Sequence, residues 1–225
     1  IVFGDWSSDV CSSDLFKDRL FICPGNHDFG AVGNLYSHER ALRFDDILAK
    51  PLLQGGTFKG DSTPVVNFVR DGDIHIMLIA LDSNLETEHP FDFACGEIGE
   101  NQLKALNTIL KSRSAECARK VLFFHHHPFM VNDPFMELKD ARSLASMIFG
   151  RIDLVLFGHK HVMGQWPKRW GTECILASDN SPGKKFAKEI SINRNGIKIA
   201  EIPISGGASA GKPGVSGKSG SRPIH

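Results

Sequence analysis

Short, continuous apolar runs recur along the chain and predict buried strands. The clearest of them are residues 74–81, 121–124, 154–157 and 174–177. Their apolar positions do not alternate with polar ones, which is typical of strands in a sheet that is covered on both faces. Apolar residues spaced three or four positions apart predict helices over 102–111 and 138–149, and a third helix is predicted from Ser37, a capping residue, to Leu48. Strands that alternate with helices indicate an α/β fold.

Turn signals divide the remaining segments. The dipeptides Asp71-Gly72 and Asn195-Gly196 each lie between two apolar segments, and such dipeptides favour the two-residue turns of β-hairpins. A further apolar run, Leu20–Cys23, ends at Pro24 and predicts one more buried strand. The opening residues, Ile1–Asp5, are interpreted as the end of a strand that runs into a glycine turn.

The length and composition fit one globular domain with a tail. The 225 residues include 41% apolar and 23% charged residues, which is an ordinary globular composition. We assign residues 1–204 to this domain. Residues 205–225 are rich in Gly, Ser and Lys, and we expect a disordered tail there because they hold too few apolar side chains to offset the cost of ordering.

Charge and cysteine content limit the classes of partner and the location. The formal net charge of +0 gives no signal for nucleic-acid binding, and no apolar run approaches the roughly 20 residues that span a membrane. Five scattered cysteines, without a C-x-x-C pair, argue against a disulfide framework. They favour a reducing compartment, so we expect a cytoplasmic protein.

The segment Asp9–Leu15 does not follow the pattern of the rest of the chain, because it has neither a helical nor a strand period. It resembles the translation of a common sequencing-library adapter, and we interpret it as an assembly artefact; a Ser/Asp-rich loop is the alternative. On the first interpretation, native residues are missing between Asp5 and Phe16 and before Ile1.

Residues with metal or proton chemistry follow three of the predicted strands. They form the segments Gly25–Asp28, His125–Pro128 and Gly158–His161. Ligand sites in open α/β sheets lie at the carboxyl ends of strands, so we expect the three segments to converge. Imidazole, carboxylate and amide oxygen together suit zinc, iron or manganese better than calcium.

Such a set of side chains is suited to phosphate esters. A carboxylate such as Asp5 can bridge two divalent ions, and two ions roughly 3.5–4 Å apart can hold a phosphoryl group and activate a water. A phosphate ester also needs a proton on its leaving oxygen. A histidine beside an aspartate, as in His27-Asp28, is suitable for that general acid.

The ordered motifs Gly4-Asp5, Gly25–Asp28, His126–Pro128 and Gly158–His161 together resemble the calcineurin-like metallophosphoesterase family. The resemblance covers residue 1 to about residue 204 and implies a four-layer α/β/β/α sandwich, in which two mixed sheets are flanked by helices. It implies a hydroxide nucleophile held between two divalent ions of manganese, iron or zinc. The family's opening Asp-x-His motif, which supplies ligands of the first ion, has no counterpart in this sequence.

The resemblance also implies a role for each matching residue. His27 is the expected general acid, and Asp28 is expected to orient it. The expected metal ligands are Asp5, Asn26, His126, His159 and His161. In the triple histidine, His126 is the expected ligand because it lies two places before the proline, and His125 and His127 remain alternatives. Without the Asp-x-His motif, we expect this chain to bind the second ion well and the first one poorly.

The expected function is hydrolysis of a small phosphodiester, with a small phosphoester as the substrate and no membrane or nucleic acid as a partner. Monoesters and nucleotide pyrophosphates remain alternatives. Asp28 argues against the Ser/Thr protein phosphatases, which carry glutamate at that place. A second hypothesis, from a different class, is an inactive scaffold of the same fold that acts through protein contacts; metal identity, oligomeric state and natural substrate stay open.

Overall fold

The computed structural model describes residues 19–30, 35–52, 54–59, 64–86, 94–113, 116–129, 133, 135–177 and 186–203. Three expectations fall outside these ranges. They concern the strand end and carboxylate at Ile1–Asp5, the segment Asp9–Leu15 and the tail at 205–225.

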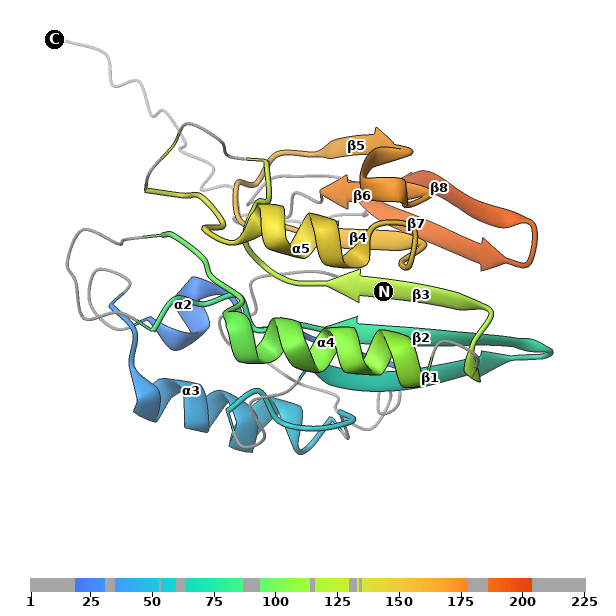
Figure 1. Ribbon diagram of the computed structural model, residues 1–225. Helices are drawn as coiled ribbons and strands as arrows, with labels where there is room; N and C mark the ends of the chain where they lie inside the picture. Colours follow the sequence, from blue (N-terminus) through green and yellow to red (C-terminus); the bar gives the residue numbers. More distant parts are fainter. Residues whose placement is uncertain are drawn as a thin grey trace, which may run out of the picture.

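A six-stranded mixed sheet forms the centre of the fold (Figure 1). Its strands are β1 (Val65–Asp71), β2 (Ile74–Ala80), β3 (Arg119–Phe123), β4 (Leu154–Phe157), β5 (Gly164–Pro167) and β6 (Cys174–Ala177). In the order β1-β2-β3-β4-β6-β5, the four central strands run parallel and the two edge strands run antiparallel to them. The carboxyl ends of β2, β3, β4 and β6 therefore lie at one edge of the sheet, on the left in Figure 1.

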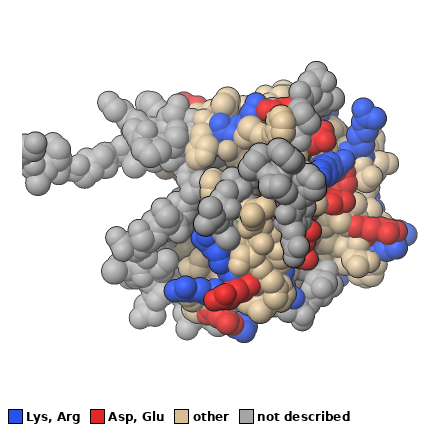
Figure 2. Space-filling view, turned by 90° about the vertical axis from the view of Figure 1, so that its left-hand side faces the viewer, with Lys and Arg blue, Asp and Glu red and all other residues tan. Residues whose placement is uncertain are grey.

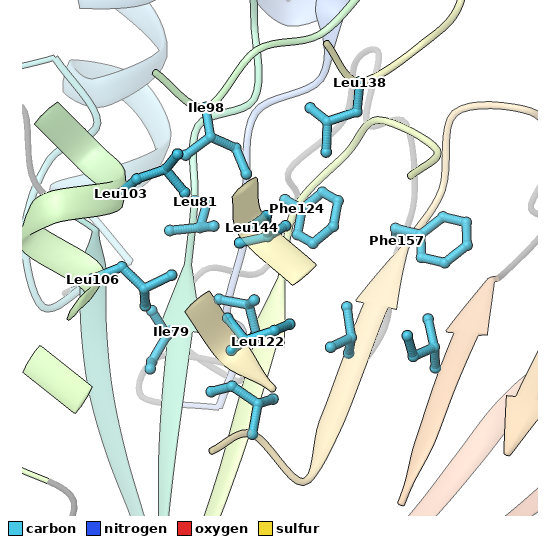
Figure 3. Close-up of a cluster of buried hydrophobic side chains, with 14 of the residues drawn as sticks. Ile79, Leu81, Ile98, Leu103, Leu106, Leu122, Phe124, Leu138, Leu144 and Phe157 are labelled. Atoms are coloured by element: carbon cyan, nitrogen blue, oxygen red, sulfur yellow. The ribbon is translucent and has the colours of Figure 1, made fainter. Parts of the chain in front are cut away.

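Two helices, α4 (Glu100–Ser112) and α5 (Ala141–Ile148), cover one face of this sheet (Figure 1). Leu106 and Leu144 of these helices are fully buried against strand residues such as Ile79 and Leu122 (Figure 3). Burial of each such side chain contributes roughly 1.5–3 kcal/mol. The two predicted helices are thus confirmed, although α5 begins later than expected, because the backbone on both sides of Leu138 is hydrogen-bonded to Gly96.

The opposite face is covered by the remaining elements. They are α2 (Asn26–Phe29), α3 (His38–Phe44), a π-helical turn η2 (Asp45–Ala49) that continues α3, and a hairpin of β7 (Phe186–Asn193) and β8 (Gly196–Pro203). Phe44 packs edge to face against Phe29 and Phe58, with ring centroids 5.6 and 5.9 Å apart. A 3₁₀ turn, η4 (Arg169–Gly171), follows β5.

These layers confirm the α/β class and the presence of a second sheet. Within the described residues, the second sheet is the antiparallel pair β7-β8 and not the mixed sheet that we expected. The helix predicted from Ser37 is also confirmed, and the Ser37 hydroxyl accepts a hydrogen bond from the backbone N–H of Arg40 at 3.4 Å. In the described ranges, no helix is long and apolar enough to span a membrane.

The apolar run Leu20–Cys23 is not a strand in the described part of the chain. Its backbone groups are bound instead by one side chain, Gln54. The amide nitrogen of Gln54 donates to the Leu20 carbonyl at 2.8 Å, and its oxygen accepts from the Ile22 N–H at 3.3 Å. A side-chain amide therefore supplies the partners that a neighbouring strand would offer.

Both predicted hairpins are confirmed, but each turn lies one residue away from the expected dipeptide. Asp71 pairs with Ile74, and Asn193 pairs with Gly196, so Arg194 and Asn195 form the second turn. The Asn193 side-chain oxygen accepts hydrogen bonds from the backbone N–H groups of Asn195 and Gly196 at 2.8 and 3.1 Å. This local asparagine turn fixes the position of the reversal.

Arg119 joins the β7-β8 hairpin to the main sheet. Its guanidinium binds Asp153 at 2.9 Å and Glu173, which lie beside the amino ends of neighbouring strands. It also donates to the backbone carbonyls of Asn193 and Arg194 at 3.1 and 2.9 Å. One side chain, with 12% of its surface exposed, therefore connects two sheets.

We expect Arg119→Ala to lower the free energy of unfolding by about 2–4 kcal/mol, because two carboxylates and two carbonyls lose a charged donor. Urea denaturation followed by circular dichroism measures the change. Lys104→Ala is the matched control: it removes a cation from an exposed pair with Glu100 and should leave the midpoint unchanged. Equal midpoints for the two variants would contradict the role of Arg119.

Candidate metal centre

The candidate site lies at the carboxyl edge of the sheet, where two neighbouring parallel strands end in histidines. His125 follows β3 and His159 follows β4. The Gly158 N–H donates to the His125 carbonyl at 3.0 Å, so the two strand ends are held together. The predicted convergence of these segments is therefore present in the structure.

Three atoms with lone pairs meet at this edge. The Nε2 atom of His125 lies 3.0 Å from the side-chain oxygen of Asn26 and 3.0 Å from Nδ1 of His159. Asn26 opens α2 and is 8% exposed. Gly25 allows this approach, because a Cβ atom at that position would lie 2.8 Å from the His125 ring.

The three consecutive histidines have three different surroundings. His126 is fully buried; the Ser83 hydroxyl oxygen accepts its backbone N–H at 3.2 Å and lies 2.8 Å from its Nδ1. His127 points into an aromatic cluster, with its ring centroid 4.7 Å from that of Phe157, and its Nδ1 accepts the Phe129 N–H. Among the described residues, only His125 has a ring nitrogen within hydrogen-bond distance of both the Asn26 side chain and the His159 ring. The rings of His126 and His159 also lie close, with centroids 4.6 Å apart.

The electrostatics of the site keep its imidazoles neutral. Burial lowers the pKa of His125 and of His126 well below the usual range, and it lowers the pKa of His159 to about 4. The charges of His27 and His161 also lower the pKa values of His125 and His159. A neutral imidazole has a free lone pair, the form in which histidine binds metals.

These donors fit a divalent ion. The Asn26 oxygen and His159 Nδ1 each lie 3.0 Å from His125 Nε2. The lone pairs of these three atoms repel one another unless protons or a cation lie among them, and a cation engages all three at once. Among the described residues, no three side chains drawn from His, Cys, Asp and Glu gather closely enough to hold an ion. The group seen here has two histidines and one asparagine, and the carboxylate expected to complete it, Asp5, lies outside the described residues.

The turn that carries His159 and His161 has an unusual backbone. Both residues lie in the left-handed region, with φ values of 73° and 52°. Non-glycine residues there cost of order 1–3 kcal/mol each and concentrate at functional sites. His161 is exposed and His159 is half-buried, so the two rings of this segment do not share one environment.

The expected catalytic pair lies on α2. The His27 side chain is exposed, and its backbone carbonyl accepts a hydrogen bond from the Arg40 guanidinium at 3.2 Å. The Asp28 carboxylate accepts the Gly25 N–H at 2.8 Å and so closes the turn that presents Asn26. Asp28 therefore has a structural role, in addition to its expected role of orienting His27.

Sequence reasoning missed one group of residues at this edge. Asp82, Ser83 and Asn84 follow the apolar strand β2 and Leu81, and all three are at most 7% exposed. A polar triplet directly after an apolar run is the same signal that identified the histidine segments. The sequence therefore carried a signal for this segment too.

The model of the calcineurin-like phosphoesterase family matches residues 3–163. A search of curated protein sequences finds no significant match.

Two solved structures have a similar fold. One is described as a 5′-nucleotidase from Staphylococcus aureus, with a TM-score of 0.51, 14% identity, and coverage of 89% of this chain and 41% of that chain. Another is a dimetal phosphatase from Danio rerio, with a TM-score of 0.50, 16% identity, and coverage of 69% of this chain and 59% of that chain. The present chain thus matches only about half of the length of these proteins, and the likeness shows the fold.

The family assignment rests on the sequence match. The matched segment contains the α2 turn, the triple histidine and the turn with His159 and His161. It covers more than half of the 225 residues. The chain therefore belongs to the calcineurin-like phosphoesterase family.

Proposed function

We propose that this chain is a metal-dependent phosphoesterase that hydrolyses small phosphodiesters. The observation that carries the proposal is that the Asn26 oxygen and the His159 Nδ1 atom each lie 3.0 Å from His125 Nε2, because all three are atoms that metals bind. The family match and the fold of the two solved structures support the class of reaction.

In this proposal Asn26, His125 and His159 hold the second ion, Asp5 is the bridging carboxylate, and His161 serves the first ion. His125 takes the ligand role that the sequence suggested for His126. When bound, divalent ions at this edge supply Lewis-acid polarisation of the phosphoryl group and lower the pKa of water. The metals that suit these donors are manganese, iron or zinc.

The remaining chemistry belongs to residues of the chain. His27 is exposed at the edge of the site, where its ring can reach a bound ester and deliver a proton to the leaving oxygen. Asp28 holds the turn through Gly25, so the position of His27 is coupled to that of Asn26. Neutral His125 and His159 are ready to bind an ion without first releasing a proton.

The charge pattern of this face supports a small substrate. In Figure 2, which looks onto the carboxyl edge, basic and acidic side chains of the described residues are interspersed. A small phosphodiester needs only the local donors of the site.

The test is metal content together with hydrolysis. We expect the purified chain, after dialysis, to retain about one ion of manganese, iron or zinc, as found by elemental analysis. Hydrolysis of bis(p-nitrophenyl) phosphate should be lost in EDTA and should rise when excess Mn²⁺ fills the weaker position. It should exceed hydrolysis of p-nitrophenyl phosphate, a monoester.

Other outcomes separate the alternatives. A preference for the monoester would contradict the proposed substrate class, but it would still agree with a phosphoesterase. Bound metal without turnover of either ester would favour the inactive scaffold. A chain that binds no metal, even in excess Mn²⁺, would contradict the proposed function as a whole.

A further inference from the structure

A buried polar segment lies beside the candidate metal centre and has no part in the chemistry proposed above. It consists of Asp82, Ser83 and Asn84, which directly follow Leu81 at the carboxyl end of β2. Gln102 of α4 fixes its backbone, because its side-chain amide binds the Asp82 N–H at 2.9 Å and the Asp82 carbonyl at 2.7 Å. The segment is thus anchored to the helical layer of the fold.

Asp82 makes contacts in two directions. Its Oδ1 atom accepts the backbone N–H of Asn84 at 2.9 Å and the side-chain amide of Asn84 at 2.7 Å. Its Oδ2 atom lies 2.6 Å from the ammonium of Lys59, and both side chains of this ion pair are less than one-tenth exposed. A buried charge held by three donors is confined to one position.

Both contacts lead to the turn that carries Asn26. The Asn84 amide, oriented by Asp82, reaches the carbonyl of Pro24 at 3.4 Å, two residues before Asn26. On the other side, the Lys59 ammonium lies 5.1 Å from the ring centroid of Phe29, the last residue of α2. Asp82 is therefore connected, through Asn84 and Lys59, to the two ends of the short segment that presents Asn26 and His27.

The Lys59 ammonium is held firmly in this position. It also pairs with Glu86 at 2.6 Å and lies 5.1 Å from the ring centroid of Tyr36. Burial alone would lower the pKa of Lys59, but Asp82 and Glu86 outweigh burial and raise it, so the ammonium stays charged. Two carboxylates and two aromatic faces surround one cation, which is a strong combination for fixing a loop.

We propose that Asp82 is a positioning residue of the metal centre, which acts through Asn84 and Lys59 to hold the Asn26 turn against the strand ends that carry His125 and His159. The inference rests on the proposed function, because it concerns the same site. Metal sites need their donor atoms held to within about 0.5 Å, and outer hydrogen-bond partners typically change metal affinity 10–100-fold.

The test is Co²⁺ titration of the full chain, followed by the absorption of the bound ion. We expect Asp82→Asn to weaken Co²⁺ binding about 10–100-fold and to change the visible absorption bands, because Asn26 is no longer held at its distance from His125. Asp153→Asn is the matched control. Its carboxylate likewise binds one cation, Arg119, and one backbone N–H, that of Lys120, but at the opposite edge of the sheet.

A second variant separates positioning from a long-range effect of charge. Loss of the negative charge of Asp82 would by itself weaken cation binding, whereas loss of the positive charge in Lys59→Met would strengthen it. Positioning predicts that both variants weaken Co²⁺ binding. Where Asp82→Asn does not fold, Asn84→Ala, which leaves the Lys59–Asp82 pair in place, should still weaken binding at least about threefold, at the low end of such outer-partner effects.

The outcomes are distinct from those that test the proposed function. A wild-type chain that binds no Co²⁺ would overturn both proposals. Wild-type binding that is unchanged in Asp82→Asn and Asn84→Ala, or tighter in Lys59→Met, would overturn the positioning role alone. One outcome would support the positioning role of Asp82. Both Asp82→Asn and Asp153→Asn would have lower thermal stability, but only Asp82→Asn would bind Co²⁺ more weakly and change its absorption.

Discussion

Replacing His125 with alanine is expected to weaken Co²⁺ binding by more than about 100-fold, which exceeds the effect of an outer hydrogen-bond partner. The reason is geometric. His125 Nε2 is the atom that lies 3.0 Å from both the Asn26 oxygen and His159 Nδ1, so its loss removes the centre of the donor group. Titration of the metal-free chain with Co²⁺, followed by visible absorption, measures the change.

The triple histidine offers its own control. His127→Ala should leave Co²⁺ affinity within a factor of two, because the His127 ring packs against Phe157 and Trp166 and not against Asn26. It should instead lower the free energy of unfolding by about 2–4 kcal/mol, as expected for removal of a buried ring. If His126→Ala abolishes Co²⁺ binding and His125→Ala does not, the assignment of the ligand to His125 is wrong.

The proposed metal ligand in the triple histidine shows how far the sequence alone could lead. Spacing from Pro128 pointed to His126. Alternation along the strand points elsewhere: Phe123 faces the core that contains α2, and Phe124 faces the core under α4 and α5. With a period of two residues, His125 shares the side of Phe123 and so meets Asn26. The sequence did not reveal on which side α2 lies, so alternation could not decide before the fold was known.

The parts of the fold that could be predicted are those fixed by local patterns. The runs at 154–157 and 174–177 coincide with β4 and β6, because a continuous apolar segment of that length is stable only between two covered faces. The predictions that were wrong concern segments whose structure depends on particular side chains or on distant residues. The backbone of Leu20–Cys23 is bound by one side chain, Gln54, and the side chain of Asn193 fixes a turn one residue away from the predicted dipeptide.

The same distinction holds for the candidate site. His159 and one histidine of the triple were predictable because each follows a strand, and Asn26 was predictable because it follows an apolar run, although that run is not a strand here. The task of Asp28 in closing the turn through the Gly25 N–H depends on a backbone geometry that no spacing reveals. The Lys59–Asp82 pair joins a loop residue before β1 to the end of β2, and only the packed fold brings the two together.

Replacing His27 with alanine is expected to lower kcat by about 10²–10⁴-fold and to leave the number of bound ions unchanged. His27 is exposed at the edge of the site, and no hydrogen bond between its ring and Asn26, His125 or His159 is seen in the described residues. A general acid acts on the leaving oxygen, whereas the metal is held by other residues. Steady-state kinetics in excess Mn²⁺ and elemental analysis of the same sample measure the two effects.

The choice of substrate makes this experiment specific. p-Nitrophenolate is a good leaving group that departs with little help from an acid, whereas the alkoxide of a 3′,5′-cyclic nucleotide requires a proton. The loss in His27→Ala should therefore be much larger for the cyclic nucleotide than for bis(p-nitrophenyl) phosphate, and it should remove the limb of the pH–rate profile that reports the acid. His38→Ala, a change of another exposed histidine on α3, should alter neither rate. Equal losses with the two leaving groups would assign His27 to substrate binding and not to proton transfer.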